Sequence, residues 1–227
     1  MGYGRLWTVV FAGLALALAA ACVGSDPVEF RGSILNPPQR AVEFTLVDQF
    51  GDRVSLSDRR GEVVVLTFLY TYCPDICPVV ASHLTEVYEQ LSADTEIGGA
   101  ISIVAVSVDP ERDTVKRVHE YSSQYGMLQG WTYLVGSEED LLQTWADYYV
   151  SPAHLKADQL EESDPLEPGL LDGDGSADSL VDHLAAAYSV DHQAPVYLID
   201  PEGMIRVLFT LPFSPEDVVA DVRTLFQ

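Results

Sequence analysis

The chain is poor in positive charge. Its 227 residues include 12 Lys and Arg against 35 Asp and Glu, which gives a formal net charge of −23. A partner with a phosphate backbone requires basic side chains, so this balance argues against nucleic acid as a partner. The excess of acids indicates a solvated, acidic surface. Hydrophobic residues make up 48% of the chain, which is enough for one domain with a real core.

The apolar run near the N-terminus, residues 9–21, is too short for a comfortable membrane span. It follows Arg5 and ends in small residues before Cys22, a pattern that resembles a bacterial lipoprotein signal. We therefore expect residues 1–22 to be a signal peptide with a lipidation site at Cys22. The mature protein would be exported and held by a lipid anchor at the outer, non-cytoplasmic face of the cell membrane. Cleavage without lipidation and an uncleaved anchor are the alternatives.

Cysteine is rare, with three residues in the whole chain. With Cys22 assigned to the processing site, Cys73 and Cys77 are left as one close pair. A disulfide that closes so small a loop would constrain the unfolded chain little, so it would add little stability. In an exported protein such a pair indicates redox chemistry or a metal site. Two buried structural cysteines are the alternative interpretation.

The pair lies where a strand is expected to turn into a helix. Residues 62–70 are apolar, β-branched and aromatic, which is typical of a buried central strand. Residues 79–91 repeat apolar side chains at three- and four-residue steps, as an amphipathic helix does. A helix N-terminus favours a thiolate over a thiol. If the first helical turn includes both cysteines, their sulfurs lie on one side, close enough for a disulfide or a shared soft metal.

The order of the expected elements predicts an α/β domain over residues 41–227, after a proline-containing linker at residues 23–40. An N-terminal β-hairpin at residues 41–56 precedes the strand and helix that flank the cysteines. The later elements are a buried strand at 100–108, a helix ending near 126, a strand at 131–135, a helix from a Ser137 cap to 148, a hairpin of strands at 195–200 and 204–209, and a helix at 214–225. Alternating strands and helices followed by a hairpin indicate a mixed central sheet flanked by helices. With a Cys pair at its first strand-to-helix turn, this is a thioredoxin-like fold.

Residues 151–182 interrupt this pattern. From Ala157 to Asp182 there are many acids and no Lys or Arg, so we expect an exposed, mobile acidic insertion. The run Asp172–Gly175 suggests a calcium loop, but the EF-hand spacing fails. Counted from Asp172, position six is Ala177 where an EF-hand has Gly, and position twelve is His183 where it has Glu.

The five histidines differ in their expected roles. His83 and His119 are expected on helices, as surface or boundary residues, while His154 and His183 flank the acidic insertion. His192 comes shortly before the strand at 195–200, and in a thioredoxin-like sheet the loop entering that strand lies against the Cys turn. One imidazole beside two thiolates would make a three-ligand soft-metal site. A solvated loop histidine is the alternative.

Three blocks of sequence together resemble the Sco/SenC family of copper-binding, thioredoxin-like assembly proteins for cytochrome c oxidase. They are Tyr72–Pro78, Val106–Thr114, and Asp191–His192 leading into Tyr197–Gly203. The resemblance implies that Cys73, Cys77 and His192 bind Cu(I) or Cu(II). The acidic insertion leaves His183 as a competitor for the third ligand position.

The same resemblance implies a metallochaperone that delivers copper to, or matures, the copper site of a cytochrome c oxidase subunit. Other copper chaperones or thiol reductants would be further partners. The alternative is an exported thiol–disulfide oxidoreductase, in which Cys73 attacks a disulfide and Cys77 resolves the intermediate. A peroxide-reducing enzyme of the peroxiredoxin kind is a weaker hypothesis. We do not expect a turnover enzyme, and thiol–disulfide oxidoreductase activity is the alternative.

Overall fold

The computed structural model describes residues 29–95, 97–155, 189–191 and 194–226. Its centre is a six-stranded sheet with the strand order β1-β10-β9-β4-β5-β6. The strands are β1 (Ser33–Arg40), β4 (Val63–Leu69), β5 (Ile101–Ser107), β6 (Thr132–Leu134), β9 (Val196–Ile199) and β10 (Met204–Phe209). β4, β5 and β6 are parallel, whereas β9, β10 and β1 add antiparallel pairs. The mixed sheet is the one predicted from the sequence.

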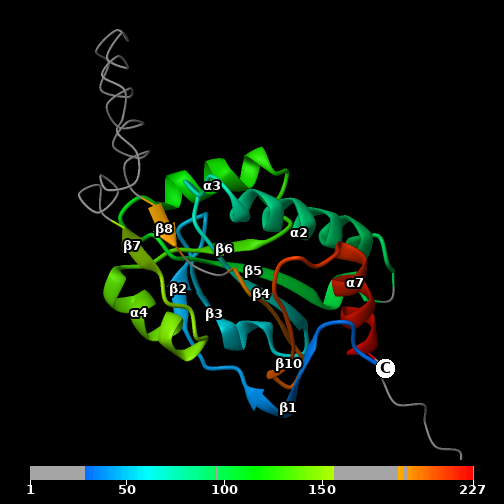
Figure 1. Ribbon diagram of the computed structural model, residues 1–227. Helices are drawn as coiled ribbons and strands as arrows, with labels where there is room; N and C mark the ends of the chain where they lie inside the picture. The colour runs from blue at the N-terminus through cyan, green and yellow to red at the C-terminus, as the bar shows by residue number, and fades with distance from the viewer. Residues whose placement is uncertain (1–28, 96, 156–188, 192–193, 227) are drawn as a thin grey trace, which may run out of the picture.

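Helices cover both sides of this sheet. They are α2 (Ile76–Ser92), α3 (Val115–Gln124), α4 (Glu138–Asp147) and α7 (Pro215–Thr224), with short 3-10 turns η2 (Leu56–Arg59) and η3 (Gly98–Ala100). Figure 1 shows α2 and α3 on one side of the sheet and α4 on the other, and α7 packs against α2. The helices begin as the sequence predicts: Ser137 and Asp140 form a capping box for α4, and Ser214 caps α7 ahead of Pro215.

β4 is the central strand of the site. All seven of its residues are buried, because β5 and β9 flank it in the sheet and helices cover both faces. This explains its unbroken apolar run. On the face of the sheet that α4 covers, Phe68 of β4 contacts Tyr148 and Tyr197, with ring centroids 5.7 and 6.5 Å away.

The predicted N-terminal hairpin is confirmed, with shorter strands than expected. It consists of β2 (Thr45–Val47) and β3 (Arg53–Ser55), paired antiparallel. Asp48 closes the turn, because its Oδ1 accepts hydrogen bonds from the N–H groups of Phe50 and Asp52 at 2.8 and 2.9 Å.

The predicted linker at residues 23–40 is wrong in its second half. Residues 33–40 form β1, which pairs with β10, and Arg31 and Gly32 just before it donate to Asp221 of α7 at 2.8 and 2.9 Å. β1 is an edge strand with mostly exposed residues and a register shift between Ile34 and Gln39. An exposed edge strand tolerates proline and needs no apolar alternation, so its sequence looks like a linker.

A second difference concerns the acidic insertion predicted at residues 151–182. Its residues 153–155 form β7 (Ala153–Leu155), which pairs antiparallel with β8 (Ser189–Asp191). The rest of the predicted insertion lies outside the described residues, as do Cys22, His183 and His192.

Candidate metal site

Cys73 and Cys77 lie at the carboxyl end of β4. β4 ends at Leu69, the turn carries Cys73, and α2 begins at Ile76, so that Cys77 is its second residue. The sequence argument considered the case in which the first helical turn includes both cysteines. In the structure Cys73 instead precedes the helix, two positions before the N-cap residue Asp75.

The two thiols are neighbours. The backbone N–H of Cys77 donates to Cys73 Sγ with a donor–acceptor distance of 3.3 Å. Both cysteines are free; Cys77 is fully buried, and Cys73 is partly exposed. Cys73 is therefore the member of the pair that a partner can reach.

The surroundings shift the two thiol pKa values in opposite directions. The pKa of Cys73 falls to about 5, chiefly because the Cys77 side chain hydrogen-bonds to it, while partial burial opposes the shift and backbone N–H groups of Asp75 and Cys77 assist. Burial raises the pKa of Cys77, and the hydrogen bond to Cys73 and the nearby Cys73 charge raise it further. At neutral pH the pair therefore consists of a Cys73 thiolate beside a Cys77 thiol.

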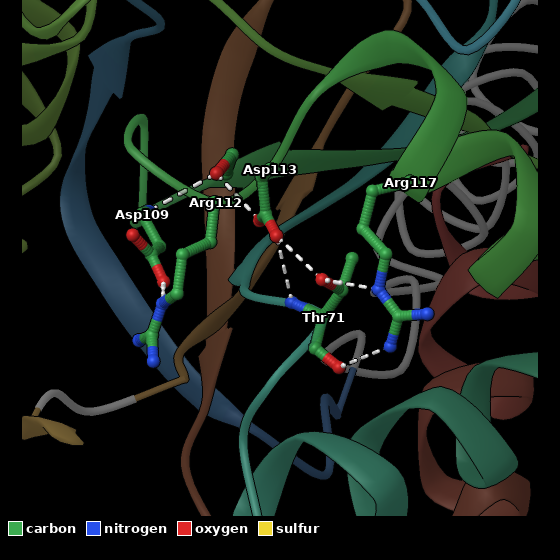
Figure 2. A network of polar contacts seen from close by, with 6 residues as sticks. Thr71, Asp109, Arg112, Asp113 and Arg117 are labelled. Atoms are coloured by element: carbon green, nitrogen blue, oxygen red, sulfur yellow. Dashed lines mark hydrogen bonds and ion pairs between the residues drawn. The ribbon is translucent and has the colours of Figure 1, made fainter. Parts of the chain in front are cut away.

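A buried carboxylate, Asp113, holds the turn that carries Cys73. Its Oδ1 accepts hydrogen bonds from Thr71 N and Thr71 Oγ1 at 3.1 and 2.7 Å, and its Oδ2 accepts one from Ser107 Oγ at 2.7 Å. Burial raises the pKa of Asp113 to about 6, although these hydrogen bonds oppose the shift. Figure 2 shows Asp113 facing Thr71, so that the carboxyl end of β5 is tied to the cysteine turn.

Two arginines complete this support. Arg117 of α3 donates from Nε to Thr71 Oγ1 at 3.1 Å, on the side of Thr71 away from Asp113 (Figure 2). Arg112 forms an ion pair with the buried Asp109. The guanidinium carbons of Arg112 and Arg117 lie 5.3 and 4.6 Å from the ring centroid of Tyr72, the residue before Cys73.

These supporting residues were not assigned a role from the sequence. Asp109, Arg112 and Asp113 belong to the block Val106–Thr114, which carried part of the family resemblance. Their place in this block could have indicated a role near the cysteines. Thr71 and Arg117 gave none, because their contacts join positions 46 residues apart in the chain.

The described residues supply two sulfur ligands and no third. They contain no group of three or more His, Cys, Asp or Glu side chains placed to hold a metal ion. Two adjacent sulfurs nevertheless fit a soft ion such as Cu(I) as a partial donor set. His192 remains a prediction. The nearest described residues after it are Ala194 and Pro195, both buried, and Pro195 O accepts a hydrogen bond from Thr67 Oγ1 of β4 at 2.9 Å.

The described helical histidines lie among aromatic side chains. His83 lies edge-on to Phe213 with ring centroids 5.2 Å apart, and His119 lies edge-on to Phe50 at 5.9 Å. Both are partly buried, in agreement with boundary positions. Within the described ranges, no helix is long and apolar enough to cross a membrane.

Known proteins share both the sequence and the fold. The SCO1/SenC family model matches residues 34–167, more than half of the chain. The SCO1 protein homolog of Bacillus subtilis is 31% identical over 60% of this chain and 66% of its own length. The mitochondrial SCO2 homolog of Bos taurus is 31% identical over 80% of this chain and 58% of its own length. The chain thus matches about three fifths of the length of these relatives.

Solved structures agree with this result. The crystal structure of Arabidopsis thaliana ScoI with copper bound has a TM-score of 0.63 and 26% identity, covering 82% of this chain and 98% of that one. Bradyrhizobium japonicum ScoI with copper bound has a TM-score of 0.60 and the same identity, covering 81% and 98%. These matches confirm the predicted thioredoxin-like α/β fold and the family resemblance. By the extent of the family match, the chain belongs to the SCO1/SenC family.

Proposed function

We propose that this protein binds a copper ion through Cys73 and Cys77 and delivers it to the copper site of a cytochrome c oxidase subunit. The observation that carries the proposal is the contact between the cysteines, with Cys77 N–H on Cys73 Sγ at 3.3 Å. Thiolate sulfur is the ligand type that Cu(I) prefers. The copper-bound ScoI structures of similar fold support copper as the cargo.

The pKa values favour loading at neutral pH. A ligand must be deprotonated to bind, and with its pKa at about 5 Cys73 is already a thiolate at pH 7. Cys77 would release its proton when the copper ion binds. The positive charge of the ion then stabilises the Cys77 thiolate and outweighs the repulsion by the Cys73 thiolate. Because Cys73 is the exposed member of the pair, a recipient's ligand would approach from its side.

We propose His192 as the third ligand. The imidazole of histidine suits Cu(II) as well as Cu(I), so two thiolates and one imidazole would hold both oxidation states. The support is positional: Asp191 ends β8, and Ala194 leads directly into β9, which pairs with β4. His183 is the competing assignment from the sequence.

A second candidate function is thiol–disulfide exchange on the recipient's copper-site cysteines or on other exported disulfides. It is favoured by the asymmetry of the pair, because a partly exposed low-pKa thiolate suits the attacking sulfur and a buried thiol suits the resolving one. The two functions are compatible, since both use the same sulfurs.

His192→Ala separates these functions. The copper affinity of the reduced full-length protein should fall at least tenfold. The rate of its exchange reaction with a small-molecule disulfide should change less than twofold. His183→Ala is the matched control and should leave both unchanged. If His183→Ala instead lowers copper affinity and His192→Ala does not, the third-ligand assignment is reversed.

The cellular setting is also part of the proposal. The signal-like residues before Cys22 support export and a lipid anchor at the outer face of the cell membrane. An anchored chaperone would meet a membrane-bound oxidase subunit, other copper chaperones and thiol reductants at that surface.

A further inference from the structure

Arg117 forms no direct ion pair with a carboxylate among the described residues; Thr71 Oγ1 lies between its guanidinium and Asp113. In the described part of the chain, ion pairs join Arg112 to Asp109, Lys116 to Glu120, Arg206 to Asp200 and Arg223 to Asp94. Arg117 takes part in none of these. Its guanidinium contacts Thr71 and Tyr72, the two residues that directly precede the reactive Cys73.

The guanidinium of Arg117 is held in place. Nε donates to Thr71 Oγ1 at 3.1 Å, Nη2 donates to Thr71 O at 3.4 Å, and the group stacks 4.6 Å from the centre of the Tyr72 ring. A guanidinium has five N–H donors, so three are left for a further acceptor. Because the side chain is already ordered, binding an acceptor costs little side-chain entropy.

The position of this group determines what it can meet. Thr71 and Tyr72 directly precede Cys73, the partly exposed thiol of the pair. A protein whose cysteine approaches Cys73 therefore passes beside the Arg117 guanidinium. A planar guanidinium fork matches a carboxylate by two parallel hydrogen bonds.

We propose that Arg117 is a docking residue that binds a carboxylate lying beside the cysteines of the partner protein. This inference rests on the proposed function, in which a partner presents its cysteines to Cys73. The formal net charge of −23 disfavours the approach of a carboxylate in general, so this point of attraction would orient the partner. Arg112, which stacks on the same ring, is already neutralised by Asp109 and is not the docking group.

Two synthetic peptides test the inference. Each contains one Cys-x-x-x-Cys disulfide; in one peptide two glutamates flank the disulfide, and in the other two glutamines replace them. The Cys73 thiolate attacks one peptide sulfur, the peptide S–S bond breaks, and its second sulfur leaves as a thiolate. Cys77 then loses its proton and displaces the first peptide sulfur, so that the protein pair is oxidised to a disulfide and the peptide is reduced to a dithiol. Two electrons pass to the peptide, one proton comes from Cys77, and the second proton comes from the solvent.

The measured quantity is the ratio of the two peptide reduction rates for full-length reduced protein. At 20 mM NaCl the glutamate peptide should react about threefold faster than the glutamine peptide, and the ratio should fall towards one at 500 mM NaCl. Arg117→Gln should abolish the preference, and Arg117→Lys should retain part of it. Lys116→Gln is the matched control: Lys116 is one residue away, its side chain is 87% exposed and it pairs with Glu120, so the ratio should not change.

The ratio distinguishes docking from a general effect on the cysteine turn. If Arg117→Gln slows both peptides equally and leaves the wild-type ratio, Arg117 acts on the turn and the inference is overturned. A wild-type ratio of one at low salt also overturns it. Copper loading is measured separately on the same proteins: failure of the wild type to bind copper would contradict the proposed copper function without altering the peptide ratio.

Discussion

The raised pKa of Asp113 predicts a specific pH dependence of stability. Asp113 is 3% exposed, and its pKa is raised from 3.8 to about 6, so the folded protein binds its proton more tightly than the unfolded chain does. A raised folded-state pKa gives stability that is fully present below the unfolded pKa and is lost as the pH rises through the folded value. Ionised Asp113 therefore costs the folded state free energy at neutral pH.

The magnitude follows from the two pKa values. The full cost above pH 7 is about 3 kcal/mol, from 1.36 kcal/mol for each pKa unit. By pH 5 about half of this cost is already present, so about 1.4 kcal/mol remains to develop between pH 5 and pH 7.5. Starting at pH 5 keeps the protein above its isoelectric point of about 4.2.

Asp113→Asn removes the titration and keeps an amide oxygen that can accept the hydrogen bonds from Thr71. The free energy of unfolding, from urea titrations of the reduced full-length apoprotein, should therefore shift in favour of the variant by about 1.4 kcal/mol from pH 5 to pH 7.5. Asp140→Asn is the control. Hydrogen bonds from Ser137 lower the pKa of Asp140, so this carboxyl is already ionised at pH 5 in both the folded and the unfolded protein. The difference in unfolding free energy between Asp140→Asn and the wild type should therefore not change from pH 5 to pH 7.5. A flat difference for Asp113→Asn would refute the reasoning.

The remaining predictions concern the thiols, the edge strand and the membrane anchor. Alkylation of Cys73 by iodoacetamide should rise with pH around a midpoint near 5, and Cys77→Ala should move that midpoint upward, because the Cys77 thiol is the main hydrogen-bond donor that lowers the pKa of Cys73; an unchanged midpoint would contradict this cause. Asp221→Ala should destabilise the protein by about 1–3 kcal/mol in urea titrations, because two backbone N–H groups before β1 lose their acceptor, whereas a loss below 0.5 kcal/mol would contradict this role. Cys22→Ala should release the protein from the membrane fraction without loss of copper binding; loss of copper from a folded variant would contradict the lipoprotein interpretation.

Much of the fold could be predicted because its central elements have strong local patterns. β4 is an unbroken apolar run since helices and strands cover it on every side, and α2 shows a regular apolar stripe since only one face is buried. The cysteine pair could be placed at a strand-to-helix turn because it lies between these two patterns. Helix starts at Ser137 and Ser214 were visible from local capping chemistry.

The parts that could not be predicted depend on contacts between distant segments. β1 is ordered by pairing with β10 and by Asp221, 190 residues after Arg31, and its own mostly exposed side chains carry no periodic signal. β7 and β8 have three residues each, too few for a pattern. The Thr71–Asp113 contact joins the ends of two neighbouring strands, and a sequence pattern does not indicate which acid after a strand turns inward.

The central claim is that Cys73 and Cys77 together bind copper as thiolates. The most direct test is a Cu(I) titration of the full-length protein under anaerobic conditions, once with the pair reduced and once with the Cys73–Cys77 disulfide formed. We predict one tightly bound copper ion per reduced chain and none per oxidised chain, because the disulfide removes both sulfur ligands. Equal copper binding by the reduced and the oxidised protein would contradict the account.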